Sequence, residues 1–162
     1  MRPACIKRKE ATIATSHVDI RPLTREDFNA VVEIDEKVFN HPRPDYYETK
    51  FARALDEKGR LVLSLVAEVE GKVTGFVMCE LFVGEYGIPA TTATLDTIGI
   101  HPDSQGKGVG KRLMEEFIGH LRKAGVQKIN TLVDWNDWQL IRFFSGSGFA
   151  PAKTINLELN VD

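Results

Sequence analysis

The sequence predicts a single mixed α/β domain, and three features lead to that prediction. The chain has 162 residues, enough for one domain with a hydrophobic core but short for two. Hydrophobic residues make up 43% and charged residues 27%, which is typical of a globular protein. Some segments alternate apolar and polar residues as strands do, and others follow helical spacing. The predicted order is strand, helix, helix, three strands, helix, strand, helix, strand.

The first part of the chain is predicted to hold a flexible tail, one strand and two helices. Residues 1–16 show no hydrophobic period, which leaves 17–162 for the domain. Thr24 is a suitable N-cap for the first helix, because Asp27 stands three residues on, where a carboxylate completes a capping box. The expected elements are a strand at 18–21, a helix from Thr24 to Phe39 and, after Pro42 and Pro44, a helix at 45–57.

The rest of the chain is predicted to hold five strands and two helices. Glu70-Gly71 is a two-residue hairpin signal between two apolar runs. Trp135 and Trp138, three residues apart, are predicted to pack a short helix onto the sheet. The expected elements are strands at 61–69, 72–83 and 92–100, a helix that ends near Ala124, a strand at 126–133, a helix at 136–145 and a final strand at 153–161.

Charge and cysteine usage exclude several classes of function. The net charge of −2 gives no bulk attraction for nucleic acid or for an anionic membrane. Cys5 and Cys79 are too few for a disulfide framework, and the four histidines lack metal-ligand spacing. No apolar run approaches the roughly 20 residues of a membrane span. We therefore expect a reduced, cytoplasmic protein with no metal, no nucleic-acid partner and no membrane association.

A glycine-rich loop between a strand and a helix is the main chemical signal. Residues 105–110 read QGKGVG and follow the strand at 92–100. The N–H groups at the start of a helix have no internal partner, and the helix dipole adds positive charge there, so such a loop suits a phosphate. Lys107, Lys111 and Arg112 would strengthen the attraction for an anion.

Two nucleotide-binding motifs fail on spacing. A P-loop would fit Gly110-Lys111 at its end, but Gln105 stands at the place of its first glycine, and Arg112 replaces the hydroxyl that binds Mg²⁺. A dinucleotide fingerprint fails because its third glycine comes one residue early and because the loop follows the fourth strand rather than the first. The remaining alternative, a tight turn without a ligand, is disfavoured by the basic residues of the loop.

A third pattern fits, and it carries a family resemblance. Q-x-x-G-x-G at 105–110, between a strand and an amphipathic helix, resembles the pyrophosphate-binding motif of the GNAT superfamily of acyl-CoA-dependent N-acetyltransferases. The Gly148-Phe149 pair after a short helix resembles the end of the family's core, and the element order matches over about 18–161. The resemblance implies a mixed central sheet of about six to seven strands, with splayed parallel strands 4 and 5, flanked by about four helices.

The resemblance also implies where acetyl-CoA, the co-substrate, would bind. The coenzyme would lie between the splayed strands, with its pyrophosphate on the glycine loop and its pantetheine along the first of these strands. One main-chain N–H of that strand would polarise the thioester as an oxyanion donor. The implied coenzyme-binding residues are Ile98, Gly99, Ile100, Gln105, Gly106, Lys107, Gly108, Val109, Gly110, Lys111, Asp137 and Phe144.

The catalytic groups are less readily predicted. Family members transfer the acetyl group by direct attack of an amine in a ternary complex, which needs a base for the amine and an acid for the thiolate. The family's usual tyrosine falls on Phe144 and a frequent glutamate on Leu132, and neither residue can transfer a proton. We predict Asp96 as a base that acts through water, and Tyr86 or water as the acid. Other polar candidates near the cleft are Asp134, Glu85 and His101.

The sequence thus predicts an N-acetyltransferase that moves an acetyl group from acetyl-CoA to a primary amine of a protein or a small molecule. The resemblance also carries the expectation of a homodimer. Phe144 at the tyrosine position motivates an alternative, a catalytically inactive sensor that binds acyl-CoA. An NTP-binding P-loop protein is a third hypothesis, disfavoured by the missing hydroxyl.

Overall fold

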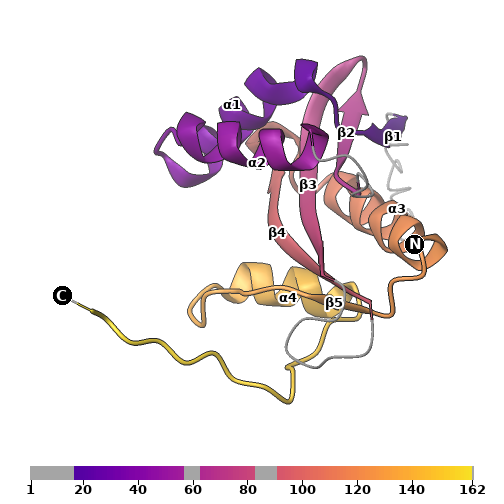
Figure 1. Cartoon of the computed structure of the whole chain (residues 1–162). Helices are drawn as coiled ribbons and strands as arrows, with labels where there is room; N and C mark the ends of the chain where they lie inside the picture. The colour runs from indigo at the N-terminus through magenta and orange to yellow at the C-terminus, as the bar shows by residue number, and fades with distance from the viewer. Residues whose placement is uncertain (1–16, 57–62, 83–90, 162) are drawn as a thin grey trace, which may run out of the picture.

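The fold is built around a mixed five-stranded sheet. The computed structural model describes residues 17–56, 63–82 and 91–161. Neighbouring strands are antiparallel except β4 and β5, which are parallel, as the resemblance implies. The strands, in spatial order, are β1 (Val18–Pro22), β2 (Leu65–Val69), β3 (Lys72–Phe82), β4 (Thr92–Ile100) and β5 (Lys128–Asn130) (Figure 1).

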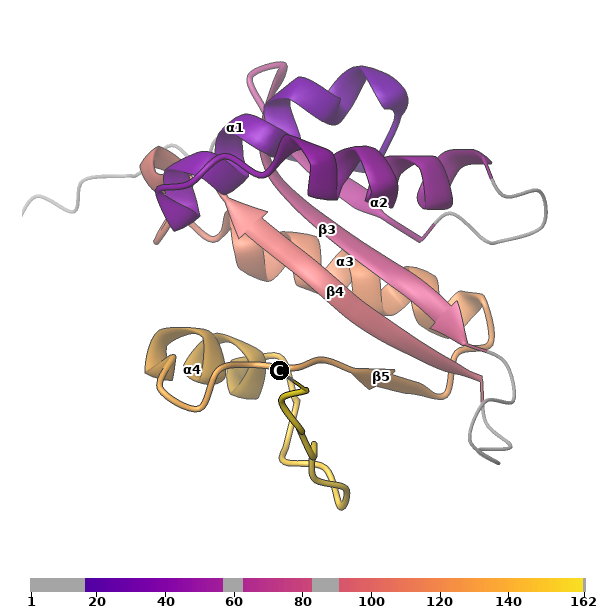
Figure 2. The same cartoon turned by 60° about the vertical axis from the view of Figure 1, so that its left-hand side comes forward.

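Helices cover both faces of the sheet. In the described residues they are α1 (Phe28–Phe39), α2 (Pro44–Asp56), α3 (Val109–Lys123) and α4 (Trp138–Gly146). Helices α1 and α2 lie on one face and α3 on the other (Figure 2). Short 3₁₀ turns precede α1 (Arg25–Asp27) and follow β4 (Pro102–Ser104). Within the described ranges, no helix has the length and apolar character needed to cross a membrane.

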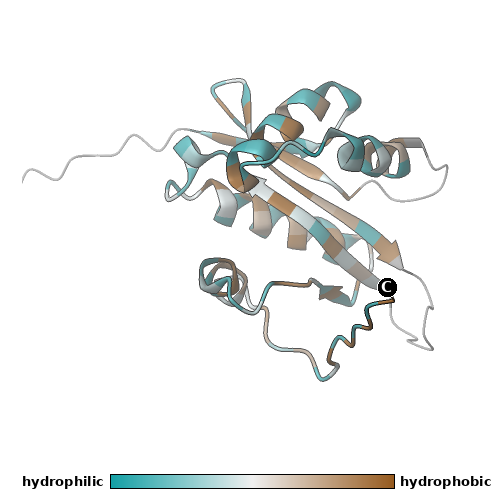
Figure 3. Cartoon of the chain, turned by 90° about the vertical axis from the view of Figure 1, so that its left-hand side faces the viewer, coloured by the Kyte–Doolittle hydropathy of each residue, from teal (hydrophilic) through white to brown (hydrophobic). Residues whose placement is uncertain are grey.

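The hydrophobic core has two layers because side chains of a strand point alternately to opposite faces of the sheet. On β3, Phe76 and Met78 are buried against α1 and α2, whereas Val77 is buried on the α3 side. Leu113 and Phe117 stand four residues apart on α3 and are fully buried in that second layer. Figure 3 shows the hydrophobic residues concentrated on the strands and on the helix faces that meet them.

The predicted hairpin at Glu70-Gly71 is confirmed. Strands β2 and β3 meet with Val69 opposite Lys72, and both turn residues have positive φ, 53° and 75°. Positive φ at both central residues is the geometry of the two-residue turn that matches the twist of the flanking strands. Gly71 adopts it without strain, since it has no Cβ.

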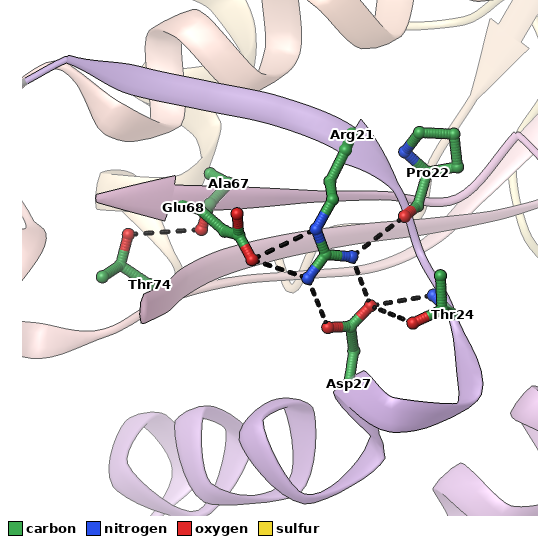
Figure 4. Close-up of polar contacts among 7 residues, drawn as sticks. All are labelled: Arg21, Pro22, Thr24, Asp27, Ala67, Glu68 and Thr74. Carbon is green, nitrogen blue, oxygen red and sulfur yellow. Dashed lines mark hydrogen bonds and ion pairs between the residues drawn. The ribbon is translucent and has the colours of Figure 1, made fainter. Parts of the chain in front are cut away.

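A partly buried ion pair fixes the start of α1 to the sheet. Arg21 on β1 makes two hydrogen bonds of 2.7 Å to the carboxylate of Asp27 and a third of 2.7 Å to Glu68 on β2 (Figure 4). Asp27 also accepts a 2.8 Å hydrogen bond from the N–H of Thr24, which completes the predicted capping box. Burial favours the neutral form of Asp27, but the hydrogen bonds from Arg21 and Thr24 outweigh it and hold its pKa below the usual value.

The prediction of a final strand at 153–161 is wrong, and within the described residues the sheet has five strands rather than six to seven. Residues 151–161 run away from the domain without a strand partner in the described part of the chain (Figure 1). The strand predicted at 126–133 is shortened to 128–130, because β4 and the chain after Asn130 diverge. In both segments the alternation is present, but a strand also needs a neighbour for its hydrogen bonds.

The predicted packing of the two tryptophans is wrong, and the predicted N-terminal tail is not tested. Trp135 and Trp138 do not pack onto the sheet, since they are 80% and 68% exposed. Instead, α4 is anchored at its other end by Phe144, which is buried in the α3-side core. The tail predicted at 1–16 lies outside the described residues.

The Arg21–Asp27 pair generates a testable prediction for stability. Asp27→Asn leaves the Arg21 guanidinium short of a charged partner, and we expect a loss of about 1–3 kcal/mol in the free energy of unfolding at pH 7. Because the folded-state pKa of Asp27 is lowered, its contribution is present above the unfolded value near pH 4 and is lost as pH falls through the folded value.

Urea unfolding of both proteins at pH 7 and at about pH 3 measures this difference. The gap between wild type and Asp27→Asn should narrow at the lower pH. Asp19→Asn is the control, because Asp19 is exposed and its ion pair is with the exposed side chain of His17. An equal difference in the free energy of unfolding between the two proteins at both pH values would contradict this role of Asp27.

Candidate active site

Strands β4 and β5 separate soon after they meet. They pair only from Thr92–Thr94 to Lys128–Asn130, and the last link between the two segments is a 3.0 Å hydrogen bond from the Thr131 hydroxyl to the carbonyl of Leu95. Figure 2 shows the chain after β5 running away from β4 toward α4. In the described residues, the main chain of β4 from Asp96 to Ile100 therefore has a strand partner only on its β3 edge.

A β-bulge lies where the separation begins. Met78 on β3 stands opposite Thr97 and Cys79 stands opposite Leu95, so Asp96 has no partner residue on β3. The Asp96 side chain is only 19% exposed although the residue as a whole is exposed, so most of that exposure belongs to its main chain. The bulge thus presents main-chain polar groups beside the splay, and bulges commonly redirect a strand next to an active site.

The glycine loop at the end of β4 has the geometry of an anion site. Gly106 and Gly108 have φ of 70° and 85°, a conformation that strains residues with a Cβ. Gly108 is the N-cap of α3, and the first bond of the helix runs from the N–H of Arg112 to the Gly108 carbonyl at 3.0 Å. The N–H groups from Gly108 to Lys111 therefore have no partner within the helix, and they carry its positive dipole end.

Gly110 and Gln105 attach this loop to its surroundings. A Cβ on Gly110 would lie 3.3 Å from the ring of Phe143 on α4 and 3.4 Å from Ile100 on β4, which is too close for easy substitution. The side-chain amide of Gln105 donates a 3.0 Å hydrogen bond to the carbonyl of Ile100. The start of α3 is thus held against β4 and α4, the elements on either side of the splay.

The basic residues of the loop surround this helix end. Lys107 is exposed. The Lys111 side chain is 81% exposed, with its ammonium 3.9 Å from Glu115, and the Arg112 guanidinium lies 2.7 Å from Glu116. Exposed pairs of this kind contribute little, so all three side chains are available to a bound anion.

Asp137 and Phe144 hold α4 in place. Asp137 is the N-cap of α4, and its carboxylate accepts a 2.8 Å hydrogen bond from the N–H of Leu140. Phe144 is 4% exposed, with its ring centroid 5.5 Å from that of Phe143 and 5.0 Å from that of Phe149. The ring of Phe144 therefore packs in the core. A coenzyme contact for either residue stays a prediction.

The side chain of Asp96 points toward α2, where it meets a residue that the sequence did not single out. The ammonium of Lys50 on α2 lies 2.7 Å from the Asp96 carboxylate and 3.2 Å from that of Glu80 on β3. Burial opposes the charge of Lys50, but the two carboxylates outweigh it and raise its pKa above the usual value. Lys50 is one of several polar residues on α2, so no motif marked it.

These charged groups line a small hollow between α2 and the sheet. Its cavity volume is about 20 Å³, enough for a water molecule. Burial and the nearby charges of Asp96 and Glu80 raise the pKa of the Cys79 thiol to about 12, so the thiol stays protonated at neutral pH. The lining residues include Lys50, Arg53, Ser64, Cys79, Glu80 and Asp96.

A buried network holds α2 against β4 near the bulge. The carboxylate of Asp35 on α1 accepts hydrogen bonds of 2.6 and 2.9 Å from Arg43 and one of 2.7 Å from the hydroxyl of Tyr47. The Tyr47 hydroxyl is also 3.3 Å from that of Thr97, the residue after Asp96. Burial is the main reason that the pKa of Tyr47 is raised well above its usual value. The side chain of Tyr47 is fully buried in the core.

The other predicted catalytic candidates are dispersed. His101 caps the turn after β4, and its ring nitrogen is 2.8 Å from the Lys37 ammonium of α1. Asp134 is exposed in the loop before α4. Tyr86 and Glu85 lie outside the described residues. Within the described residues, no cluster of three or more His, Cys, Asp or Glu side chains suits a metal ion.

Comparisons with known proteins agree with this architecture. The chain is 31% identical over 120 residues to the uncharacterized N-acetyltransferase YjhQ of Escherichia coli, covering 72% of this chain and 64% of that protein. It is 26% identical over 133 residues to mycothiol acetyltransferase of Propionibacterium freudenreichii, covering 80% of this chain and 42% of that protein. The chain thus spans about two fifths to two thirds of the length of these curated relatives.

Solved structures show the same fold. Aminoglycoside N-acetyltransferase AAC(6')-Iy in complex with CoA superposes with a TM-score of 0.73 at 16% identity, covering 90% of this chain and 95% of that one. The family model described as the acetyltransferase (GNAT) family matches residues 24–149, which include strands β2 to β5, the bulge, the glycine loop and α4. From this match, the chain belongs to the GNAT acetyltransferase family.

Proposed function

We propose that this protein is an N-acetyltransferase that moves the acetyl group of acetyl-CoA to a primary amine of a protein or a small molecule. The observation that carries the proposal is the glycine loop at the amino end of α3, beside the splay of β4 and β5. Unbonded N–H groups suited to a diphosphate stand there at the end of a strand whose free edge suits an extended chain. The anion site would hold the pyrophosphate of the coenzyme, and the free strand edge would hold the pantetheine chain that is attached to it.

Coenzyme binding would use main-chain groups more than side chains. The N–H groups from Gly108 to Lys111 would donate to the pyrophosphate, with Lys107 and Arg112 adding charge. The pantetheine would run along the free edge of β4 from Ile100 toward the bulge. A main-chain N–H at the bulge would donate to the thioester oxygen, where negative charge develops during attack.

The acetyl transfer needs no enzyme nucleophile in this arrangement. The amine nitrogen attacks the thioester carbon, the carbon–sulfur bond breaks, and the acetyl group remains on nitrogen. The ammonium gives up its proton before attack and the leaving thiolate takes one. We propose that the carboxylate of Asp96, released from Lys50 when the acceptor binds, accepts the amine's proton through water. The thiolate would be protonated by Tyr86 or by water.

The acceptor would enter over α2. The hollow there is lined by Lys50 and Arg53 from α2 and by Glu80 and Asp96 from the sheet, so it presents both signs of charge. The ammonium group of an acceptor would take the place of the Lys50 ammonium beside the carboxylates of Glu80 and Asp96. The names of similar proteins, an uncharacterized N-acetyltransferase and an aminoglycoside N-acetyltransferase, support an amine acceptor.

A second function, a sensor that binds acyl-CoA without turnover, is favoured by one observation. Phe144, at the family's usual tyrosine position, has no hydroxyl, and its ring is buried among Phe143 and Phe149. That position therefore supplies no proton to the thiolate. Release of CoA thiol in the presence of an amine separates the enzyme from the sensor.

The glycine loop generates a prediction for coenzyme binding. Gly108→Asp places a carboxylate at the anion site and strains a positive φ, so we expect at least a 100-fold loss of acetyl-CoA affinity by isothermal titration. Gly125→Asp is the matched control, because Gly125 also has a positive φ of 80° with open space around it but lies at the other end of α3. Its affinity should stay within about threefold of wild type.

The same proteins are assayed for thiol release over a panel of primary amines. Wild type should release CoA thiol with at least one amine, and Gly108→Asp with none at the same coenzyme concentration. Binding without release on any amine favours the sensor. Unchanged acetyl-CoA affinity in Gly108→Asp would contradict the location of the site.

The second prediction tests Asp96. Asp96→Asn keeps the shape of the side chain but removes the proposed base, so we expect kcat to fall about 100-fold, within the range for general bases, with acetyl-CoA affinity within about threefold. Glu80→Gln is the matched control, because it also removes a carboxylate partner of Lys50 but lies on β3. Its kcat should fall less than tenfold. Equal losses of kcat in the two variants would indicate that the effect comes from removing a carboxylate partner of Lys50, not from removing a base.

The third prediction tests direct transfer. Because the Cys79 thiol has a pKa raised to about 12, it should not carry the acetyl group at neutral pH. We expect Cys79→Ala to keep kcat within about threefold and the wild-type mass to show no acetyl-enzyme after mixing with acetyl-CoA alone. An acetylated Cys79 peptide that decays when amine is added would contradict direct attack.

A further inference from the structure

Four charged side chains alternate in sign along the hollow between α2 and the sheet. In this charge row, Asp96, Lys50, Glu80 and Arg53 follow one another, with 2.7, 3.2 and 3.7 Å between successive charged groups. The first three side chains are between 16% and 20% exposed, whereas Arg53 at the outer end is 55% exposed. The row is neutral, with two charges of each sign. A ligand of a single charge that displaced one member of the row would leave that member without its partners.

Lys50 is the member of the charge row that an acceptor must move. Its ammonium is paired with the carboxylate of Asp96, the proposed base, and a partly buried charge is costly to leave unpaired. An ammonium has three N–H donors, and carboxylates of the described residues accept from two of those of Lys50. A simple amine could replace Lys50 at Asp96 but would offer Lys50 no new partner. An acceptor with a carboxylate of its own can pair with both side chains.

We propose that the acceptor is an α-amino acid, in which a carboxylate and the reacting amine are attached to the same carbon. This inference rests on the proposed acetyl transfer and narrows its acceptor. The ammonium of the acceptor pairs with Asp96, and its carboxylate binds the ammonium of Lys50. The two charges of an α-amino acid lie close together, as do those of the Lys50–Asp96 pair at 2.7 Å, so the four charges alternate around a compact ring. Every partly buried charge then keeps a partner of opposite sign.

The carboxylate of the acceptor also accounts for the release of Asp96. As Lys50 turns toward that carboxylate, Asp96 keeps the acceptor's ammonium and takes a proton from it through water. The nitrogen bonds to the acetyl carbon and the carbon–sulfur bond breaks. The nitrogen loses two protons in all: Asp96 passes one to solvent, and the other is balanced by the proton that the leaving thiolate takes up. The product is an N-acetylamino acid with a neutral amide nitrogen, so Asp96 pairs with Lys50 again and the product is released.

The first test measures binding without turnover. A set of α-amino acids and the carboxamide of each is titrated by calorimetry into the protein saturated with CoA, which carries no acetyl group. A carboxamide keeps the amine and the side chain but lacks the carboxylate. We expect at least one amino acid to bind about 100-fold more tightly than its carboxamide, because a site that pairs a polar group of its ligand rejects the analogue without it. Equal affinities, or no binding of any amino acid, overturn the proposal.

The second test assigns this preference to Lys50. Lys50→Met keeps an unbranched side chain but removes the ammonium, so we expect the two ligands to bind it within about threefold of each other. Lys72→Met is the matched control, because Lys72 is exposed at the start of β3 and does not line the hollow. Its preference should stay within about threefold of wild type. Cooperative thermal unfolding shows that each variant is folded, and the first test needs wild type alone. A preference that Lys50→Met leaves unchanged overturns the proposal.

Thiol release from acetyl-CoA separates this inference from the proposed function. Wild type should release CoA thiol with the preferred amino acid, with kcat/KM about 100-fold higher than with its carboxamide. Equal rates with amino acids and their carboxamides overturn the inference and leave the acetyltransferase in place. Selective binding of an amino acid without thiol release on any amine contradicts the proposed function and supports the amino-acid site.

Discussion

The parting of β4 and β5 after three paired residues governs much of this domain. The two strands pair as far as Thr94, the hydroxyl of Thr131 still reaches the carbonyl of Leu95, and beyond it β4 keeps only its β3 partner in the described residues. A strand edge with unpaired N–H and C=O groups is costly inside a protein, so it must meet water or a ligand. Here that edge runs from the bulge at Asp96 to Ile100, and a short 3₁₀ turn then leads into the glycine loop. The free edge and the anion site are thus consecutive in the chain, which suits a long ligand with a phosphate in its middle.

Helix α2 forms the other side of the candidate site and supplies a charged side chain to it. The Asp35–Arg43–Tyr47 network is buried and reaches Thr97, so α2 is fixed next to the bulge rather than only packed on the sheet. The same helix carries Lys50, whose ammonium lies between Asp96 and Glu80. A buried ion pair is costly to break from one side, because the remaining charge loses its partner. In the proposed mechanism, Lys50 would have to release the carboxylate of Asp96 before an acceptor could use it.

Local signals in the sequence predicted much of the fold. The capping box at Thr24, the hairpin at Glu70-Gly71 and the glycine loop depend on nearest neighbours in the chain, and all three have the expected structure. The predicted strand at 153–161 did not form, because alternation of apolar residues defines one face of a strand but does not supply a neighbouring strand. Trp135 and Trp138 failed for a similar reason, since spacing along a helix does not show what lies opposite it. Lys50 was missed because its partners come from two other strands.

The sequence by itself predicted the order of elements as far as α4, the glycine loop at the start of a helix and the family, because glycine geometry and hydrophobic period are properties of short segments. The tertiary structure alone decided which residues meet. It placed Asp96 against Lys50, buried the ring of Phe144, left β4 with a free edge and left the apolar face of residues 155–161 uncovered. These outcomes depend on contacts between segments far apart in the chain, and a pattern within one segment carries no information about the distance to another.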